Sequence, residues 1–285
     1  MKKIFFLLFI IFLFNSCQKE IELDLDTTTP KFVIEGIVST SSNESFVRIT
    51  KSSNFYDTER FLEIENAEVI IKDETANQEY LFEYGLYNGY AVYRNSLFTG
   101  IEGHKYTMQV KVEGQEFTAT STVAPTVELE YLRQVGEAKI EGFGKYKSTF
   151  AKIIPVFKDP EELGNNYRFV VGVSKRVYNN VTKQYEYSNQ PYLLGIIYAF
   201  NDLIFNNTEN TRSLNIEVEK DDMVIIDMQN IDNNVYDYLY TLSQSYPQDG
   251  GPPTSNPTNP VSNISGGALG YFSAHSSMKK LIIVK

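Results

Sequence analysis

The chain has 285 residues, a formal net charge of -10 and 42% hydrophobic residues, which is enough apolar material for a substantial core. Its length exceeds that of a typical single domain, so two domains are the natural expectation. The acidic balance argues against nucleic acid or anionic lipid headgroups as partners, because both would repel the protein. The single cysteine excludes an intramolecular disulfide framework and any multi-thiolate metal site.

The amino-terminal stretch has the pattern of a secretory signal. Lys2 and Lys3 precede an unbroken apolar run over residues 4–14. This run is shorter than the ~20 residues that a membrane-spanning helix needs. It leads to Ser16 and then to Cys17, the only cysteine of the chain.

A small residue directly before a cysteine resembles a bacterial lipobox. In that class Cys17 is lipidated on its thiol and becomes the mature amino terminus, so residues 1–16 would be a lipoprotein signal peptide. Phe14 stands where the lipobox usually has an aliphatic residue. Several acyl chains would anchor the protein stably, since each buried methylene contributes about 0.8 kcal/mol. The alternative is a conventional signal that ends in a cysteine by chance.

The residues after the cysteine resemble an export signal. Gln18, Lys19 and Glu20 resemble the signal that directs Bacteroidota lipoproteins to the outer face of the outer membrane. We interpret residues 17–29 as an acidic tether between the membrane and the first domain. Within this tether, Thr27 lies in a short motif that resembles a Bacteroidota O-glycosylation acceptor.

Residues 30–125 have the pattern of a β-sandwich. Tyr106, Met108, Val110 and Val112 alternate with polar residues, which predicts a strand with one buried face. A turn at 113–114 leads into a further strand, which predicts a hairpin. The other expected strands are 32–38, 46–50, 67–72, 79–84 and 89–93. The order of "NAEVIIKD", "GYAVY" and "GHKYTMQVKVEG" resembles the transthyretin-like, or carboxypeptidase-regulatory-like, β-sandwich, whose members are structural spacers or binding modules.

Residues 126–285 continue in β, so the predicted fold class is mostly β, with a second antiparallel β-rich domain after the sandwich. One helix is expected near 233–246, with Asp232 or Asn233 as its cap. A Pro/Gly-rich loop follows at 247–260. The expected strands are 149–157, 167–178, 182–187, 192–200, 214–218, 223–228 and 280–284.

Three tyrosines are candidates for ligand or partner contact. Tyr236 and Tyr240 lie side by side on one face of the predicted helix, and Tyr271 follows a glycine-rich stretch. Packing against a sheet is the simpler interpretation of the helical pair. The loops at 158–166 and 247–260 are candidate contact surfaces, because loops carry much of the binding function of proteins.

The sequence predicts no catalytic residue, no metal ligand and no cofactor, and we expect that the protein is not an enzyme. His275 lies near Ser273 and Ser276, but neighbours along a strand point apart and no Gly-x-Ser-x-Gly elbow is present. The acidic run from Asp221 to Asp232 is spread over a strand, so its carboxylates would not converge on a calcium ion.

Taken in order, several stretches resemble the Bacteroidota lipoproteins of domain-of-unknown-function family 4249. These stretches are "EIELDL", "FVIEGIVS", "NAEVIIKD", "FKDPEELGNNYRF" and "NPVSNISGGALGYFSAHS". The resemblance implies a surface lipoprotein that assists a TonB-dependent outer-membrane receptor, and it carries no catalytic residues. We therefore expect a non-enzymatic accessory, capping or ligand-capture subunit of a nutrient uptake system. A stand-alone glycan- or peptide-binding adhesin is the alternative, and a hydrolase ranks last. The ligand stays open.

Overall fold

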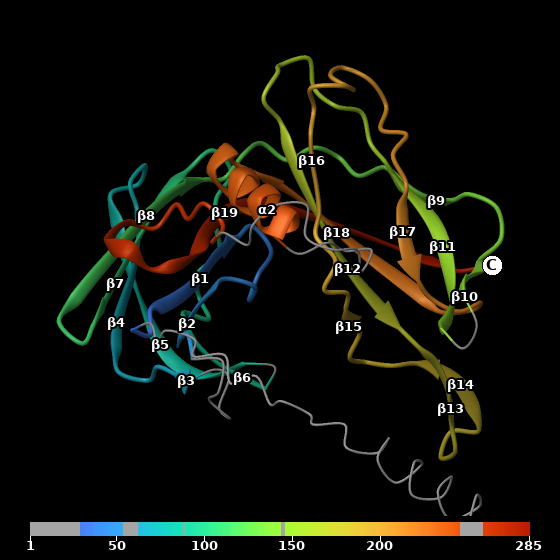
Figure 1. The fold of residues 1–285 in the computed structure, drawn as a ribbon, viewed down its shortest axis with the longest axis horizontal. Helices are drawn as coiled ribbons and strands as arrows, with labels where there is room; N and C mark the ends of the chain where they lie inside the picture. Colours follow the sequence, from blue (N-terminus) through green and yellow to red (C-terminus); the bar gives the residue numbers. More distant parts are fainter. Residues whose placement is uncertain (1–28, 54–61, 88, 144–145, 246–258) are drawn as a thin grey trace, which may run out of the picture.

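The computed structural model describes residues 29–53, 62–87, 89–143, 146–245 and 259–285 (Figure 1). Within these residues the chain is mostly β, which confirms the predicted fold class. The elements are β1 (Phe32–Ser39), β2 (Phe46–Lys51), β3 (Leu62–Glu63), β4 (Ala67–Asp73), β5 (Gln78–Tyr87), β6 (Tyr90–Arg94), β7 (Lys105–Val112), β8 (Gln115–Thr122), β9 (Tyr131–Gln134), β10 (Lys139–Phe143), β11 (Tyr146–Val156), β12 (Asn166–Ser174), β13 (Arg176–Asn179), β14 (Gln184–Tyr187), β15 (Tyr192–Leu193), β16 (Tyr198–Asn201), β17 (Leu214–Glu217), β18 (Met223–Ile231), α2 (Asn233–Ser245), η1 (Ser265–Gly267) and β19 (Leu269–Ile283).

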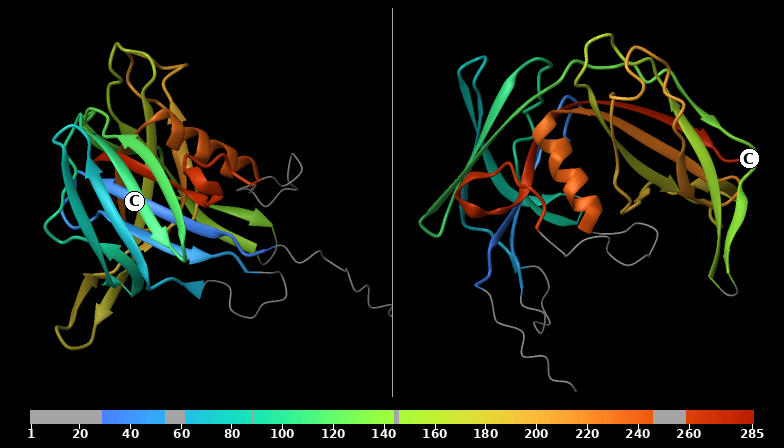
Figure 2. Two further views of the ribbon diagram at one scale, coloured as in Figure 1. Left: turned by 90° about the vertical axis from the view of Figure 1, so that its left-hand side faces the viewer. Right: turned by 45° about the horizontal axis from the view of Figure 1, so that its top comes forward.

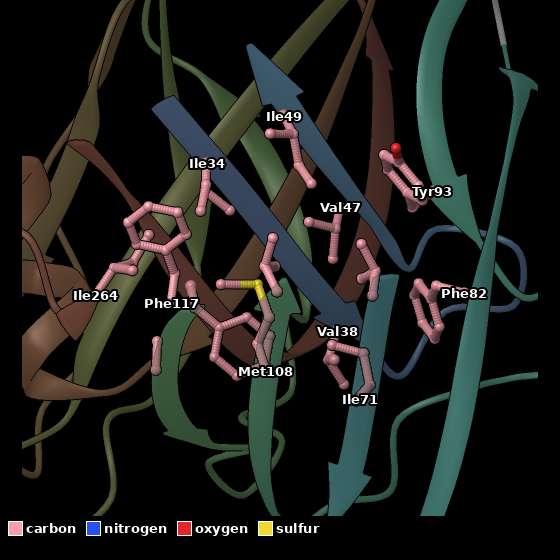
Figure 3. Packing of buried hydrophobic residues seen from close by; sticks show 14 of the residues in the cluster. Ile34, Val38, Val47, Ile49, Ile71, Phe82, Tyr93, Met108, Phe117 and Ile264 are labelled. Carbon is pink, nitrogen blue, oxygen red and sulfur yellow. The ribbon is translucent and has the colours of Figure 1, made fainter. Parts of the chain in front are cut away.

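The first half of the chain forms two facing layers around a first core. Its strands follow the order β1-β2-β6-β5-β4-β7-β8 in one continuous sheet. Figure 3 shows side chains of β1 and β2, such as Ile34 and Val47, pointing toward Met108 and Phe117 of the opposite strands. The alternation predicted for residues 106–112 is confirmed, because β7 buries every second side chain.

The second half surrounds a second core. Strands β12, β18 and β19 form one wall, and a four-stranded sheet of β9, β10, β11 and β17 forms the other. The side chains between these walls include Ile153, Phe157, Phe169, Ile216 and Ile226. A separate hairpin of β13 and β14 carries the exposed pair Tyr178 and Tyr185.

Strand β19 joins the two halves into one 13-stranded sheet. Its first part pairs in parallel with β1, from Val33 opposite Leu269 to Ser39 opposite His275. Its second part pairs antiparallel with β18. Phe272 therefore enters the first core, whereas Ile282 packs against the second, on the same face of the strand. The first core thus takes in residues from the end of the chain as well as from the predicted 30–125 segment.

Several element boundaries differ from the sequence-based expectation. The last strand begins at Leu269 rather than Lys280, because residues 269–275 pair with β1, a non-local partner that the local sequence pattern does not indicate. The expected strand 167–178 is divided at Lys175 into β12 and β13, and the expected strand 192–200 is divided into β15 and β16. The helix is confirmed, and Asp232 is its cap, since its Oδ1 accepts a hydrogen bond from the Val235 amide at 3.0 Å.

Candidate functional site

Helix α2 crosses one face of the large sheet near the junction of the two halves (Figures 1 and 2). Val235 and Leu239 are its buried residues. Tyr236 and Tyr240 stack with ring centroids 6.1 Å apart; Tyr236 packs against the cluster of Val235 and Leu239, whereas Tyr240 is 53% exposed. The Tyr236 hydroxyl accepts a hydrogen bond from Asn201 Nδ2 at 3.2 Å, and burial raises the pKa of Tyr236. The Tyr236 ring is therefore held in place by a hydrogen bond, whereas the Tyr240 ring is accessible to solvent.

Tyr271 lies in the interior, which differs from the expectation of a contact residue. It is 6% exposed, and its ring stacks on Tyr238 of α2 with centroids 4.8 Å apart. Its hydroxyl donates to Glu35 Oε1 at 3.1 Å and accepts from Arg168 Nη1 at 3.0 Å. Burial raises the pKa of Tyr271. Tyr271 is buried because α2 covers this face of β19.

The structure brings together a set of polar side chains that the sequence did not single out. They lie on the face of the sheet opposite the two cores, and we refer to them as the polar face. The polar face consists of Glu35, Arg168, Asp227, Gln229, Tyr271, Ser273, His275 and Ser277. Alternate positions of β19 contribute half of them, because residues two apart in a strand point to the same side. Two features of the sequence could have revealed the polar face. They are the period of two along β19 and the single arginine, Arg168, in the otherwise mostly apolar strand β12.

Hydrogen bonds connect the polar face along β18 and β19. Asp227 accepts from the Ser277 hydroxyl at 2.6 Å and from Gln229 Nε2 at 2.8 Å. Ser273 Oγ and His275 Nδ1 are 2.9 Å apart, and both side chains are almost fully buried. Gln229 Oε1 is buried and has no hydrogen-bond partner.

The charges of the polar face compensate one another. Burial lowers the pKa of Arg168, but the hydroxyl of Tyr271 and the charges of Glu35 and Asp227 outweigh it, so the net shift is upward. Burial raises the pKa of Asp227. Burial, assisted by the charge of Arg168, lowers the pKa of His275 to about 3. His275 is therefore neutral at physiological pH.

The Ser273–His275 contact corrects one step of the sequence argument. These residues share a face of β19 and touch, because they are two positions apart rather than adjacent. A catalytic triad also needs a carboxylate that orients the histidine. The oxygens of Asp227 accept from Ser277 and Gln229 instead. The arrangement is a buried hydrogen-bonding network at the junction of the two halves.

Several other predicted site residues lie in the amino-terminal segment or in loops. Cys17, Gln18, Lys19 and Glu20 lie outside the described residues, as does most of the loop 247–260. The loop 158–166 is described, and it packs against the turn that follows β16. Within the described residues, no helix is long and apolar enough to cross a membrane. In that same part of the chain, no group of three or more His, Cys, Asp or Glu side chains is arranged to hold a metal ion.

Comparison with known proteins identifies the family of this chain. The match to the family described as Domain of unknown function (DUF4249) extends over residues 18–281. The chain belongs to this family. No curated protein matches the chain. Membership confirms the family to which the sequence motifs pointed, and it assigns no role to the polar face or to the tyrosines of α2.

Proposed function

We propose that the protein is a lipid-anchored surface protein of the outer membrane that serves a TonB-dependent uptake system as an accessory, capping or ligand-capture subunit. The observation that carries the proposal is the position of the only cysteine. Cys17 follows an apolar run and precedes Lys19 and Glu20, and both patterns resemble Bacteroidota surface lipoproteins. Membership of DUF4249 agrees with this proposal, because the resemblance that implied a TonB-dependent receptor was to the same family.

In this proposal the protein acts by presentation rather than by chemistry. A lipid on Cys17 would hold the tether at the membrane, and the tether would lead into β1. The first half, which resembles a transthyretin-like sandwich in sequence, would be a spacer or binding module. Because β19 belongs to both halves, the two halves would move as one body. The exposed ring of Tyr240 and the loop 158–166 would face the ligand or the receptor.

The test is affinity capture from outer membranes with a carboxyl-terminal tag, read out by mass spectrometry. The proposal expects that a TonB-dependent receptor is recovered with the lipidated protein and lost with Cys17→Ala. A matched Ser16→Ala variant keeps a small residue before the cysteine and should retain the receptor. Recovery of the surface-exposed protein without any receptor would overturn the proposal and favour a stand-alone glycan- or peptide-binding adhesin.

A further inference from the structure

Two loops meet at one end of the second half of the molecule. One joins β11 to β12, and the other follows β16. The amide of Asp159 donates to the Thr208 carbonyl at 3.0 Å, and the amide of Asp202 donates to the Asn165 carbonyl at 3.1 Å. These backbone hydrogen bonds connect the loops in both directions.

Two buried carboxylates lie in this junction. Asp159 and Asp202 are each 1% exposed. Asp159 accepts from the Tyr167 hydroxyl and from the Asn207 amide, the latter at 3.2 Å. Asp202 Oδ2 accepts from the amides of Gly164 and Asn165 at 2.7 and 2.9 Å. Both carboxylates therefore contact the turn that follows β16, since Asp202 lies in this turn and Asp159 binds its Asn207 amide.

The junction lacks a compensating cation among the described residues. None of the ion pairs in this part of the chain includes Asp159 or Asp202. Two buried like charges without a cation are unfavourable, because an opposite charge offsets the loss of hydration more fully than hydrogen bonds do. The amides that bind the carboxylates are dipoles and leave the net charge unchanged.

Two oxygen atoms of the same turn are buried without any hydrogen-bond partner. They are Oδ1 of Asp202 and Oδ1 of Asn206. The amide of Asn206 is oriented by its Nδ2, which donates to the Glu161 carbonyl of the opposite loop at 3.1 Å. Native proteins rarely leave buried oxygens unsatisfied, and coordination to an ion is one of the few explanations. Because Asp202 is almost fully buried, this carboxylate oxygen is not satisfied by bulk water.

We propose that Asp159, Asp202 and Asn206 bind one calcium ion at this junction. All three contribute oxygen, which suits a hard cation better than zinc, whose sites usually include histidine nitrogen or cysteine sulfur. Two carboxylates match the charge of a divalent ion, and an amide oxygen is a common third ligand. Calcium accepts six to eight oxygens in flexible geometry, so water and backbone carbonyls complete its shell more readily than they complete the strict octahedron of magnesium.

The ion would hold together two loops that expose apolar side chains. Leu163 of the first loop and Leu203 and Ile204 of the second are each at least 69% exposed. Calcium would therefore order the two loops that carry these three residues. The proposal does not depend on the lipid anchor or on a transport partner.

The experiment measures calcium binding by the full chain, purified in detergent and stripped with a chelator. Added calcium should raise the melting temperature in a saturable way, and magnesium should raise it less. Terbium should bind in place of calcium and emit on tyrosine excitation, because Tyr167 is hydrogen-bonded to Asp159. Absence of both a calcium-dependent shift and terbium emission would overturn the proposal.

Variants identify the site. Asp202→Asn should weaken calcium binding by tenfold or more, and Asn206→Asp, which adds a third carboxylate, should tighten it. Asp237→Asn changes an exposed acid of α2 and should leave binding unchanged. If Asp202→Asn does not fold, Asn206→Asp and Asn206→Ala decide the question by shifting the affinity in opposite directions. Equal calcium affinity in the wild type and these Asn206 variants would place the ion elsewhere and refute the assignment.

Discussion

A β-carbon added to Gly270 would lie 2.0 Å from the carbonyl oxygen of Ile34. Gly270 also has a φ of +97°, which L side chains rarely adopt. This contact occurs where β19 begins its parallel pairing with β1, so the junction of the two halves depends on a residue without a side chain.

Gly270→Ala should therefore destabilise the protein by at least about 2 kcal/mol, since the alanine adds both a steric overlap and backbone strain. The measurement is the free energy of unfolding in urea. Gly85→Ala is the matched control, because Gly85 also lies in a strand but has no atom within 4 Å of an added β-carbon. Similar losses for both variants would show that close approach of β19 is not the cause.

Arg168 supports the polar face through its charge. Arg168→Met keeps much of the side-chain volume but removes the positive charge that interacts with Glu35 and Asp227. We expect a loss of about 2 kcal/mol or more in the free energy of unfolding, because removing one partner leaves buried negative charge uncompensated. The double variant Arg168→Met, Glu35→Gln should recover part of this loss. A double variant that is no more stable than the single would contradict the electrostatic explanation.

His275 should make the protein sensitive to mild acid. Its pKa is lowered from 6.5 to about 3 in the folded state, so below its ordinary pKa the unfolded chain binds a proton that the folded chain does not. Stability is therefore full above that pKa and falls as the pH falls, by up to about 1.4 kcal/mol per pH unit for this one group. His275→Asn removes the titration and keeps an amide that can contact Ser273. Urea unfolding at pH values from about 7 down to about 5 should show a shallower loss in the variant. If the wild type and His275→Asn lost stability equally with falling pH, His275 would not be the source of the acid sensitivity.

Asp232 connects α2 to the first half. Its Oδ1 caps the helix at Val235, and its Oδ2 accepts from the Ser121 hydroxyl of β8 at 2.5 Å. Asp232→Ala should cost about 2 kcal/mol, since both a helix cap and a charge-assisted hydrogen bond are lost. Thermal unfolding followed by circular dichroism measures the effect. Asp237→Ala removes an exposed acid from the same helix and should change stability by less than about 0.5 kcal/mol.

A substitution at Tyr240 tests partner contact without a large effect on folding stability. Tyr240→Ala should change the free energy of unfolding by less than about 1 kcal/mol, because the ring is 53% exposed and contributes one stacking contact. If α2 is the partner surface, the same variant should reduce receptor capture in the pull-down. Tyr185→Ala, in the exposed β13–β14 hairpin, is the control. Capture that is unaffected by Tyr240→Ala would exclude this part of α2 from the contact.

Local sequence pattern determined several elements of this protein by itself. Alternation predicted β7, turn residues predicted its hairpin with β8, and a polar residue before an apolar repeat predicted α2, because each of these depends on neighbours within a few positions. Two outcomes depended on tertiary structure. The first part of β19 is a strand because β1 lies beside it, although the two segments come from opposite ends of the chain. Likewise Arg168, Asp227 and Tyr271 form one polar face only because parallel and antiparallel pairing place β12, β18, β19 and β1 side by side. Periodicity reports which face of an element is buried, whereas the partner that covers that face is chosen by non-local pairing and packing.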